Sequence, residues 1–374
     1  MDFSLNADHE ALRDSARAVL DKEVDLAPLL APGATVAQAG YARLWAHMTD
    51  LGWPGLVIPE AYGGLGMSMI DLTMIVGEIG RTLAPAPLFG TLAGGWAVEA
   101  AGSEEQKANI LGAVAAGALK LALAIADEAG TPCGAGVSAD DRHRLRGERH
   151  FVVDGAAADK LIVAAHLKGS LRWFVVDRAA PGVEIELVAW RDITRQVCIV
   201  RLDQAQGELL PLGDEASWPW VRDRLYVVLA AESAAGTRRV LDDAVAYAKE
   251  RVAFGKTIGS FQAIKHALAD VKGQTEAAAA AVLYAAWALD ESDPRQSMAA
   301  AIAQSYASEA YCDATFRNIQ VFGAIGFMWE MKNHLYFKRA RANAELLGAP
   351  EAQREEILQL LETEAQAQRQ PEKV

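Results

Sequence analysis

Cysteine is scarce in this chain, with three residues among 374: Cys133, Cys198 and Cys312. They lie far apart and form neither a CxxC pair nor a Cys/His group with the spacing of zinc ligands. An odd, scattered set also provides no disulfide framework. We therefore expect inert thiols in a reducing compartment and no metal site.

Positive charge is also in short supply. Lys and Arg number 36 against 49 Asp and Glu, which gives a formal net charge of −13. An acidic surface repels phosphate backbones and anionic membranes, so neither nucleic acid nor a membrane is expected as a partner. An anionic small molecule would need a local basic pocket.

The chain lacks a long uninterrupted hydrophobic run. Its most apolar stretch, 110–126, is short for a spanning helix and contains Lys120, Gly112 and Gly117. The first twenty residues carry acidic side chains early and have no apolar core of the kind found in signal peptides. These features predict a soluble, cytoplasmic protein.

What the sequence does contain is apolar periodicity of two kinds, within a composition that is 52% hydrophobic. Helical spacing dominates the N-terminal region and returns from Trp218 onward. Between 121 and 212, short runs such as KLIVAA and RWFVVD alternate with turn residues, as in a small antiparallel β-domain. This order predicts an α+β protein. The expected domains are an N-terminal helical domain (1–118), a middle β-domain (119–214) and a C-terminal helical domain (215–374).

Three segments carry the most specific patterns: LGWPGLVIPEAYGGLGMSMIDL (51–72), YAKERVAFGKTIGSFQAIKHALADV (247–271) and NIQVFGAIGFMWEMKNHLYFKRA (318–340). In order and spacing they resemble the acyl-CoA dehydrogenase family, and the resemblance covers nearly the whole chain. The pattern RxxFGxxIGxFQ in the second segment is the most specific. The resemblance implies the family fold, with a C-terminal four-helix-type bundle, and FAD-dependent removal of two hydrogens from an acyl-CoA thioester.

The residue types in these segments suit a dinucleotide. Arg251 offers a rigid fork of donors for a pyrophosphate, Phe254 offers a flat apolar face, and the Gln262 amide can bond a nucleotide edge. The resemblance implies that these residues reach into the FAD site of a neighbouring subunit, with Gln320 and Gly323 near its adenosine. We therefore predict FAD contacts at all five residues.

The chain departs from the family at the usual position of the catalytic base. In the family, a Glu that precedes a Gly takes the α-proton of the thioester while flavin N5 accepts the β-hydride. The matching residue here is Leu347, followed by Gly348, and leucine cannot take a proton. Glu345 lies two residues away and points elsewhere on a helix or turn.

The second position of the base in the family, on the helix that leads into RxxFG, is also altered. The expected Glu aligns with Leu225 and the Arg that usually follows it aligns with Tyr226. A slip of one residue offers Arg224, which is no base, and Glu232 lies about two turns further on as a weak candidate. No catalytic residue is therefore assigned.

Segments that hold the chain's own flavin in the family depart as well. A Thr-Glu-Pro-like sequence is replaced by 126–130, and a Trp-Ile-Thr sequence by 151–153. Phe151 can still stack on a flavin ring and is included among the predicted FAD contacts, whereas Val153 cannot donate a side-chain hydrogen bond. Ala324 replaces a second glycine after Gly323.

The losses affect residues that would serve this chain's own flavin and base, whereas those that serve a neighbour's FAD are mostly intact. This pattern indicates a base-lacking subunit that completes its partner's site in an α2β2 heterotetramer. By resemblance, such assemblies belong to the branch of the family that acts on steroid-derived CoA thioesters. The IGFxWE sequence in the third segment also favours membership of that branch. An active homotetramer with a displaced base and a flavin-free scaffold of the same fold remain alternatives. By family analogy, an electron-transfer flavoprotein accepts the electrons.

Overall fold

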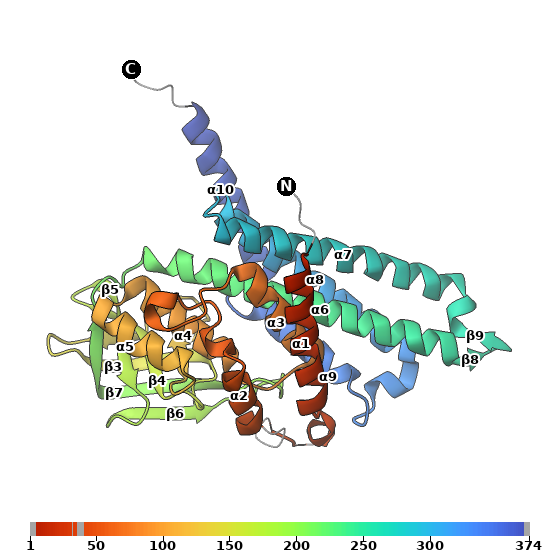
Figure 1. Cartoon of the computed structure of the whole chain (residues 1–374), viewed down its shortest axis with the longest axis horizontal. Helices are drawn as coiled ribbons and strands as arrows, with labels where there is room; N and C mark the ends of the chain where they lie inside the picture. Colours follow the sequence, from red (N-terminus) through yellow and green to blue (C-terminus); the bar gives the residue numbers. More distant parts are fainter. Residues whose placement is uncertain (1–4, 32, 36–40, 370–374) are drawn as a thin grey trace. The chain divides into compact units, whose positions relative to one another are not determined.

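The computed structural model describes residues 5–31, 33–35 and 41–369, in which helices come first, a β-sheet follows and helices return (Figure 1). The first helices are α1 (Ala7–Glu23), α2 (Tyr41–Asp50), α3 (Met69–Thr82), α4 (Leu88–Ala101) and α5 (Glu104–Ala115). The strands of the main sheet are β1 (Leu121–Ala124), β2 (Val137–Ala139), β3 (Arg144–Val153), β4 (Lys160–Leu167), β5 (Ser170–Asp177), β6 (Val183–Leu187) and β7 (Val197–Leu210). The C-terminal elements are α6 (Ser217–Glu250), β8 (Val252–Ala253), β9 (Lys256–Thr257), α7 (Gln262–Asp290), α8 (Gln296–Phe322), α9 (Asn333–Glu345) and α10 (Pro350–Arg369).

This element order confirms the predicted α+β class, with helical, β and helical regions in turn. The domain bounds 1–118, 119–214 and 215–374 stay a prediction. Contacts between Cα atoms divide the chain differently, into two compact units. The bundle unit comprises Met1–Arg13, Thr73–Thr82 and Tyr226–Val374, and the sheet unit comprises Asp14–Leu72 and Leu83–Leu225.

The sheet unit contains a seven-stranded sheet in the order β1-β4-β2-β3-β7-β5, with β6 paired to β7. Strand β4 also pairs with β5, so the ladder closes on itself. Strands β1 and β2 run parallel to β4, whereas the other pairs are antiparallel. The expectation of an antiparallel domain is therefore wrong in part, because side-chain alternation marks a strand but not the direction of its neighbour.

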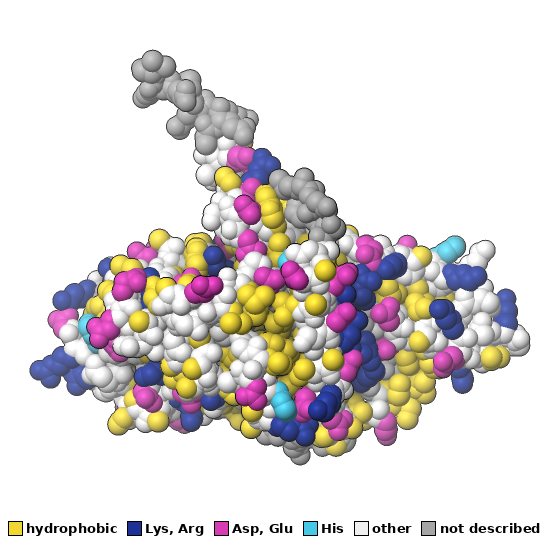
Figure 2. All heavy atoms as spheres, in the orientation of Figure 1, with side chains coloured by type: hydrophobic (Ala, Val, Ile, Leu, Met, Phe, Trp, Pro, Cys, Tyr) yellow, Lys and Arg dark blue, Asp and Glu magenta, His cyan; other side chains and the backbone are white. Residues whose placement is uncertain are grey.

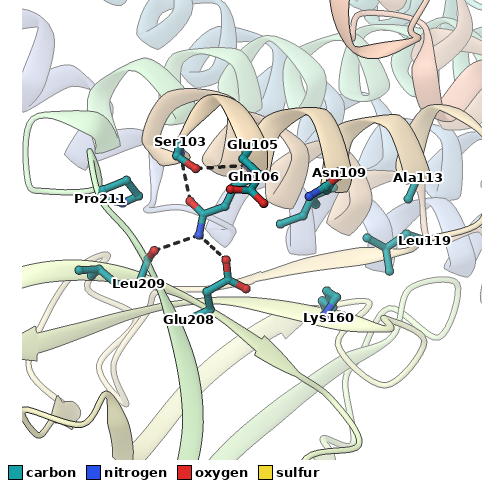
Figure 3. A pocket seen from close by; sticks show the side chains of 11 residues that line it. Ser103, Glu105, Gln106, Asn109, Ala113, Leu119, Lys160, Glu208, Leu209 and Pro211 are labelled. Atoms are coloured by element: carbon teal, nitrogen blue, oxygen red, sulfur yellow. Dashed lines mark hydrogen bonds between the residues drawn. The ribbon is translucent and has the colours of Figure 1, made fainter.

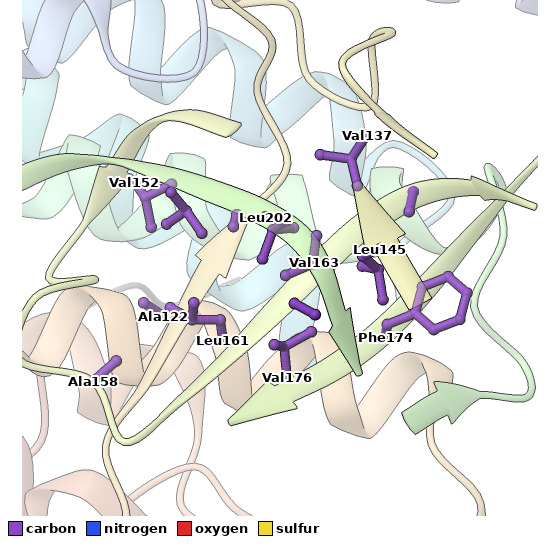
Figure 4. Packing of buried hydrophobic residues seen from close by; sticks show 14 of the residues in the cluster. Ala122, Val137, Leu145, Val152, Ala158, Leu161, Val163, Phe174, Val176 and Leu202 are labelled. Carbon is purple, nitrogen blue, oxygen red and sulfur yellow. The ribbon is translucent and has the colours of Figure 1, made fainter. Parts of the chain in front are cut away.

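Apolar side chains from alternate positions of these strands form the core of the sheet unit. Val152, Val163, Phe174 and Leu202 are buried together in one cluster (Figure 4). Helix α4 covers part of this unit and is buried on nearly all sides. It approaches β1 so closely that a Cβ atom on Gly94 would lie 2.4 Å from the Leu121 Cβ.

The bundle unit is built from the long helices α6, α7 and α8 together with α9, as the predicted four-helix-type bundle requires. Buried side chains tie the helices together. The Gln304 Nε2 of α8 donates to the Asn343 carbonyl oxygen of α9 at 2.9 Å. The Tyr336 hydroxyl of α9 donates to the Arg81 carbonyl oxygen of α3 at 2.7 Å.

The close crossing of α3 and α6 makes a matched pair of glycine substitutions informative. A Cβ atom on Gly80 would lie 2.4 Å from the Glu232 carbonyl oxygen, whereas one on Gly77 meets only the Ala235 Cβ at 3.6 Å. We expect Gly80→Ala to destabilise the protein by about 1–3 kcal/mol, because the backbones must move apart. Gly77→Ala should be neutral or stabilising by up to about 1 kcal/mol, since alanine is the better helix former. Urea unfolding of the two variants checks this, and equal effects would contradict the crossing.

Among the residues that the structure describes, no helix is long and apolar enough to span a membrane. On the face drawn in Figure 2, acidic and basic side chains are interspersed, and apolar side chains reach the surface between them. This face therefore mixes both signs of charge despite the net charge of −13.

Candidate cofactor-facing site

The hairpin β8–β9 presents a strained aromatic side chain at its tip. Val252 pairs with Thr257 and Ala253 with Lys256, which leaves a two-residue turn of Phe254 and Gly255. Both turn residues have positive φ, 53° for Phe254 and 77° for Gly255. Placing a non-glycine residue in this region costs about 1–2 kcal/mol. The Phe254 side chain is nevertheless 95% exposed, so packing within this chain does not explain it.

The hairpin also carries a lysine next to its aromatic residues. The Lys256 ammonium lies 4.5 Å from the ring centroid of Phe261, and that ring meets Phe254 edge-on at 6.2 Å. Arg251 and Gln262 flank the hairpin and are exposed. No described residue forms an ion pair with Arg251, which leaves its guanidinium available to an anion. Lys256 was not singled out from the sequence, although a lysine in a glycine-rich turn is itself a signal for anion binding.

The end of α8 lies beside this hairpin. A small cluster of Ala244, Ala248 and Val321 packs with Ile258, which follows β9, so α6, α8 and the hairpin meet at one end of the bundle unit. The Tyr247 ring stacks on Phe322 with centroids 4.2 Å apart and an interplanar angle of 12°.

Gln320 and Gly323 are both exposed at this end of α8. Gly323 has φ 67° and ψ −143°, and a Cβ atom there would meet nothing within 4 Å. The structure thus gathers Arg251, Phe254, Gln262, Gln320 and Gly323 at one end of the bundle unit, which we call the hairpin corner. A guanidinium, an exposed ring and an open glycine suit a dinucleotide such as FAD.

Phe151, the remaining predicted FAD contact, belongs to the sheet unit. It lies where the β3–β7 register shifts, has φ 53° and is half-buried. Its ring meets Trp190 edge-on at 6.1 Å, and a Cβ atom on Gly130 would lie 3.7 Å from it. The ring therefore packs within the sheet unit, and its role toward a flavin stays a prediction.

The loop that replaces the family's Thr-Glu-Pro sequence borders an acidic pocket of about 640 Å³. Its lining includes the carboxylates of Asp127, Glu128 and Glu148, and His150 Nε2 lies 3.4 Å from Glu148. Beneath it, the fully buried Arg149 donates from Nε to the Ala164 carbonyl oxygen at 2.9 Å rather than pointing outward. Because its carboxylates repel anions, this pocket fits a pyrophosphate poorly.

A second pocket of about 630 Å³ lies between α5 and the end of β7 in the sheet unit (Figure 3). The Gln106 side chain crosses it, donating to the Leu209 carbonyl oxygen at 3.0 Å and to Glu208 Oε1 at 2.5 Å. Ser103 and Gln106 also form a capping box at the start of α5. These bonds make it a joint between helix and sheet, and none of the predicted site residues lines it.

The two residues that the sequence resemblance matches to the family's base, Leu347 and Leu225, have no carboxylate. Leu347 is half-buried after α9, with φ 66°, and Gly348 follows with φ 107°. The Gln353 Nε2 fixes this turn by donating to the Gly348 carbonyl oxygen at 2.8 Å. Glu345 is exposed on the last turn of α9. At the other position, Leu225 is buried.

The weaker candidates from the sequence have structural roles. Glu232 is buried, with its Oε2 3.4 Å from the Arg339 Nη1 and 3.3 Å from the Asn343 Nδ2. This carboxylate therefore belongs to a buried ion pair between α6 and α9. The Arg224 guanidinium stacks 3.4 Å from the Trp220 ring centroid and donates to the Trp220 carbonyl oxygen.

The three cysteines are free, and none is an obvious nucleophile. Burial raises the pKa of the Cys133 thiol to about 11 and that of Cys198 to about 12, and it also raises the pKa of Cys312. All three are therefore protonated at neutral pH. Among the described residues, no group of three or more His, Cys, Asp or Glu side chains is placed to hold a metal ion.

Sequence models of two domains match the chain. "Acyl-CoA dehydrogenase, N-terminal domain" matches residues 6–118 and "Acyl-CoA dehydrogenase, C-terminal domain" matches residues 224–361. Acyl-CoA dehydrogenase IpdE2 of Mycobacterium tuberculosis is 34% identical over 361 residues, covering 96% of this chain and 97% of that protein. Acyl-CoA dehydrogenase FadE34 of the same organism is 35% identical over 318 residues, covering 83% of this chain but 41% of that protein.

Solved structures agree with this assignment. A variant of the Tcur3481-Tcur3483 steroid ACAD is 27% identical, with a TM-score of 0.85 over 96% of this chain and 98% of that chain. The ChsE4-ChsE5 complex of Mycobacterium tuberculosis shares the fold at 24% identity, with a TM-score of 0.87 over 96% and 99%. The fold and the motifs are those of an FAD-dependent oxidoreductase. The chain belongs to the acyl-CoA dehydrogenase family, whose members are flavoproteins that oxidise acyl-CoA thioesters.

Proposed function

We propose that this chain is the base-lacking subunit of an α2β2 acyl-CoA dehydrogenase and that its hairpin corner completes the FAD site of the other subunit. The observation that carries the proposal is the contrast between two positions. Phe254 is held strained and 95% exposed at the hairpin tip, whereas the base position holds Leu347. An exposed, strained ring suits a contact with a neighbouring chain, and Leu347 cannot take a proton.

Each residue of the hairpin corner has a distinct part in this proposal. Arg251 binds the anionic pyrophosphate through its fork of donors, with Lys256 as a second nearby cation. Phe254 covers an aromatic ring of the cofactor, and Gln262 and Gln320 bond its polar edges. Gly323 leaves room for the adenosine. When bound, FAD accepts the hydride from the β-carbon of the thioester. In the alternative of an active homotetramer, Phe151 of the sheet unit is the proposed stacking contact for this chain's own flavin.

The substrate and partners follow the same relatives. We propose a bulky or steroid-derived acyl-CoA, which is supported by the similarity to a protein described as a steroid ACAD and named for two chains. The proposed partner is a second acyl-CoA dehydrogenase chain that carries the base. An electron-transfer flavoprotein is the proposed electron acceptor, and the cytoplasm the proposed location.

The displaced-base alternative makes Glu345 the test residue, because it is the carboxylate nearest in sequence to Leu347 and is exposed. In the complex isolated from its own host, we expect Glu345→Gln to leave the rate of flavin bleaching by acyl-CoA unchanged. Loss of a general base slows such a step by about 10²–10⁴-fold. Anaerobic stopped-flow absorbance measures the rate. A fall of that size would place the base on this chain and contradict the proposal that the partner chain carries it.

A further inference from the structure

The loop that joins α8 to α9 carries the Gly323 side of the hairpin corner and has no regular helix or strand of its own beyond a short 3-10 turn, Gly323–Phe327. Several of its side chains are exposed, including Phe327 at 76% and Trp329 at 47%. A loop of this kind needs anchors if it is to present Gln320 and Gly323 in one fixed arrangement.

Two buried amide side chains hold the two ends of this loop together. Asn318 lies on α8 just before Gln320, and Asn333 is the first residue of α9. The Asn333 Nδ2 donates to the Asn318 Oδ1 at 2.5 Å, and the Asn318 Nδ2 donates to the Val240 carbonyl oxygen of α6 at 2.7 Å. Their exposed fractions are 3% and 6%, so both bonds are made away from water. The pair therefore holds α6, α8 and the start of α9 in one fixed arrangement.

Contacts further along the loop add to this anchoring. Trp329 lies edge-on to the His334 ring at 5.1 Å and under the Lys338 ammonium at 4.7 Å. On the other side, Phe322 is stacked on Tyr247. Gln320 thus lies between two fixed residues, Asn318 and Phe322, and Gly323 directly follows the second.

We propose that Asn333, through Asn318, is a positioning residue for FAD: it fixes the conformation in which Gln320 and Gly323 meet the cofactor. Two aliphatic side chains would fill the same space. They would not fix a single position of the loop relative to α6 and α8, because apolar contacts have no preferred direction. The amide pair does, because its two hydrogen bonds form only when Asn333, Asn318 and the Val240 carbonyl oxygen keep these relative positions. The inference rests on the proposed role of the hairpin corner in FAD binding.

The test uses the complex isolated from its own host through a tag on this chain, with added FAD as the probe. We expect Asn333→Leu to lower FAD affinity about tenfold, because the loop loses its register and the Asn318 Oδ1 loses its donor. The visible circular dichroism of the remaining flavin should change as well. In the double variant Asn318→Leu/Asn333→Leu, the thermal midpoint should recover toward that of the wild type while FAD affinity stays low.

Gln304→Leu is the matched control, because it removes another buried amide of α8 that bonds Asn343 and not the loop. It should lower the thermal midpoint and leave FAD affinity unchanged. Equal loss of FAD in Gln304→Leu, or recovery of FAD affinity in the double variant, would reduce the amide pair to a structural role and overturn the inference. Failure of the proposed function itself looks different, since FAD affinity would then be insensitive to Arg251→Met.

Discussion

Replacing Phe254 with asparagine is expected to remove most of the FAD from the hetero-oligomer while leaving this chain at least as stable. Asn-Gly is a favoured pair in a two-residue hairpin turn whose residues both have positive φ. Because Phe254 is 95% exposed, its removal sacrifices almost no packing within the chain. The variant should therefore gain about 1 kcal/mol from relieved strain. Loss of the aromatic face should weaken FAD retention at least about tenfold.

Two measurements on the complex check the Phe254 prediction: FAD retained after gel filtration and the midpoint of thermal unfolding. Leu187→Asn is a suitable control, because Leu187 is 60% exposed on β6 of the sheet unit and lies outside the hairpin corner. It should change neither quantity. If Phe254→Asn keeps its full flavin content, the strained aromatic tip has another purpose and the assignment of the hairpin corner is wrong.

Arg339→Met is expected to give the largest loss of stability in the bundle unit. Arg339 and Glu232 are both buried, at 2% and 3% exposure, with 3.4 Å between Nη1 and Oε2. Removing the cation leaves the Glu232 carboxylate inside the bundle without the positive charge of Arg339, which helps to offset its desolvation. Breaking such a pair from one side costs about 3–5 kcal/mol. Urea unfolding followed by far-ultraviolet circular dichroism measures the loss.

The double variant Glu232→Leu/Arg339→Met should recover most of that stability, because no buried charge remains. Arg354→Met is the exposed counterpart, since Arg354 pairs with Glu309 and Glu351 at the surface. It should have little effect. A single Arg339→Met variant no less stable than Arg354→Met would show that Glu232 is not held by this ion pair, and would reopen its candidacy as a base.

Much of the fold could be predicted from the sequence because helices and strands differ in apolar period. The RxxFGxxIGxFQ pattern singled out the segment that contains the hairpin, but neither the hairpin nor the positive φ of Phe254 was predicted. The parallel pairing of β1 and β2 with β4 could not be predicted, since strand direction leaves no mark on side-chain alternation. The division of α3 between the two units could not be predicted either. It depends on the contact of Gly80 with α6, which lies far from it in the sequence.

Site residues could be proposed from the sequence only where the residue type itself suggests a chemical role. Arg251 and Phe254 stand out by type, whereas Asn318 and Asn333 stand out only as polar residues at buried helical positions. Glu232 remained a candidate base at the sequence level, because its partner Arg339 is 107 residues further along the chain. Whether such a carboxylate can act as a base depends on the residue with which it pairs. That partner lies far away in the sequence, so the local sequence does not reveal it.

The flavin content of this chain, alone and with its partner, tests the central claim most directly. We predict no bound FAD when the chain is purified alone and supplied with FAD. We predict one FAD for each pair of unlike chains in the complex, as an interface-built site requires. Absorbance in the flavin bands against protein concentration gives both values. One FAD bound to every copy of the isolated chain would contradict the account and identify a self-sufficient homotetramer.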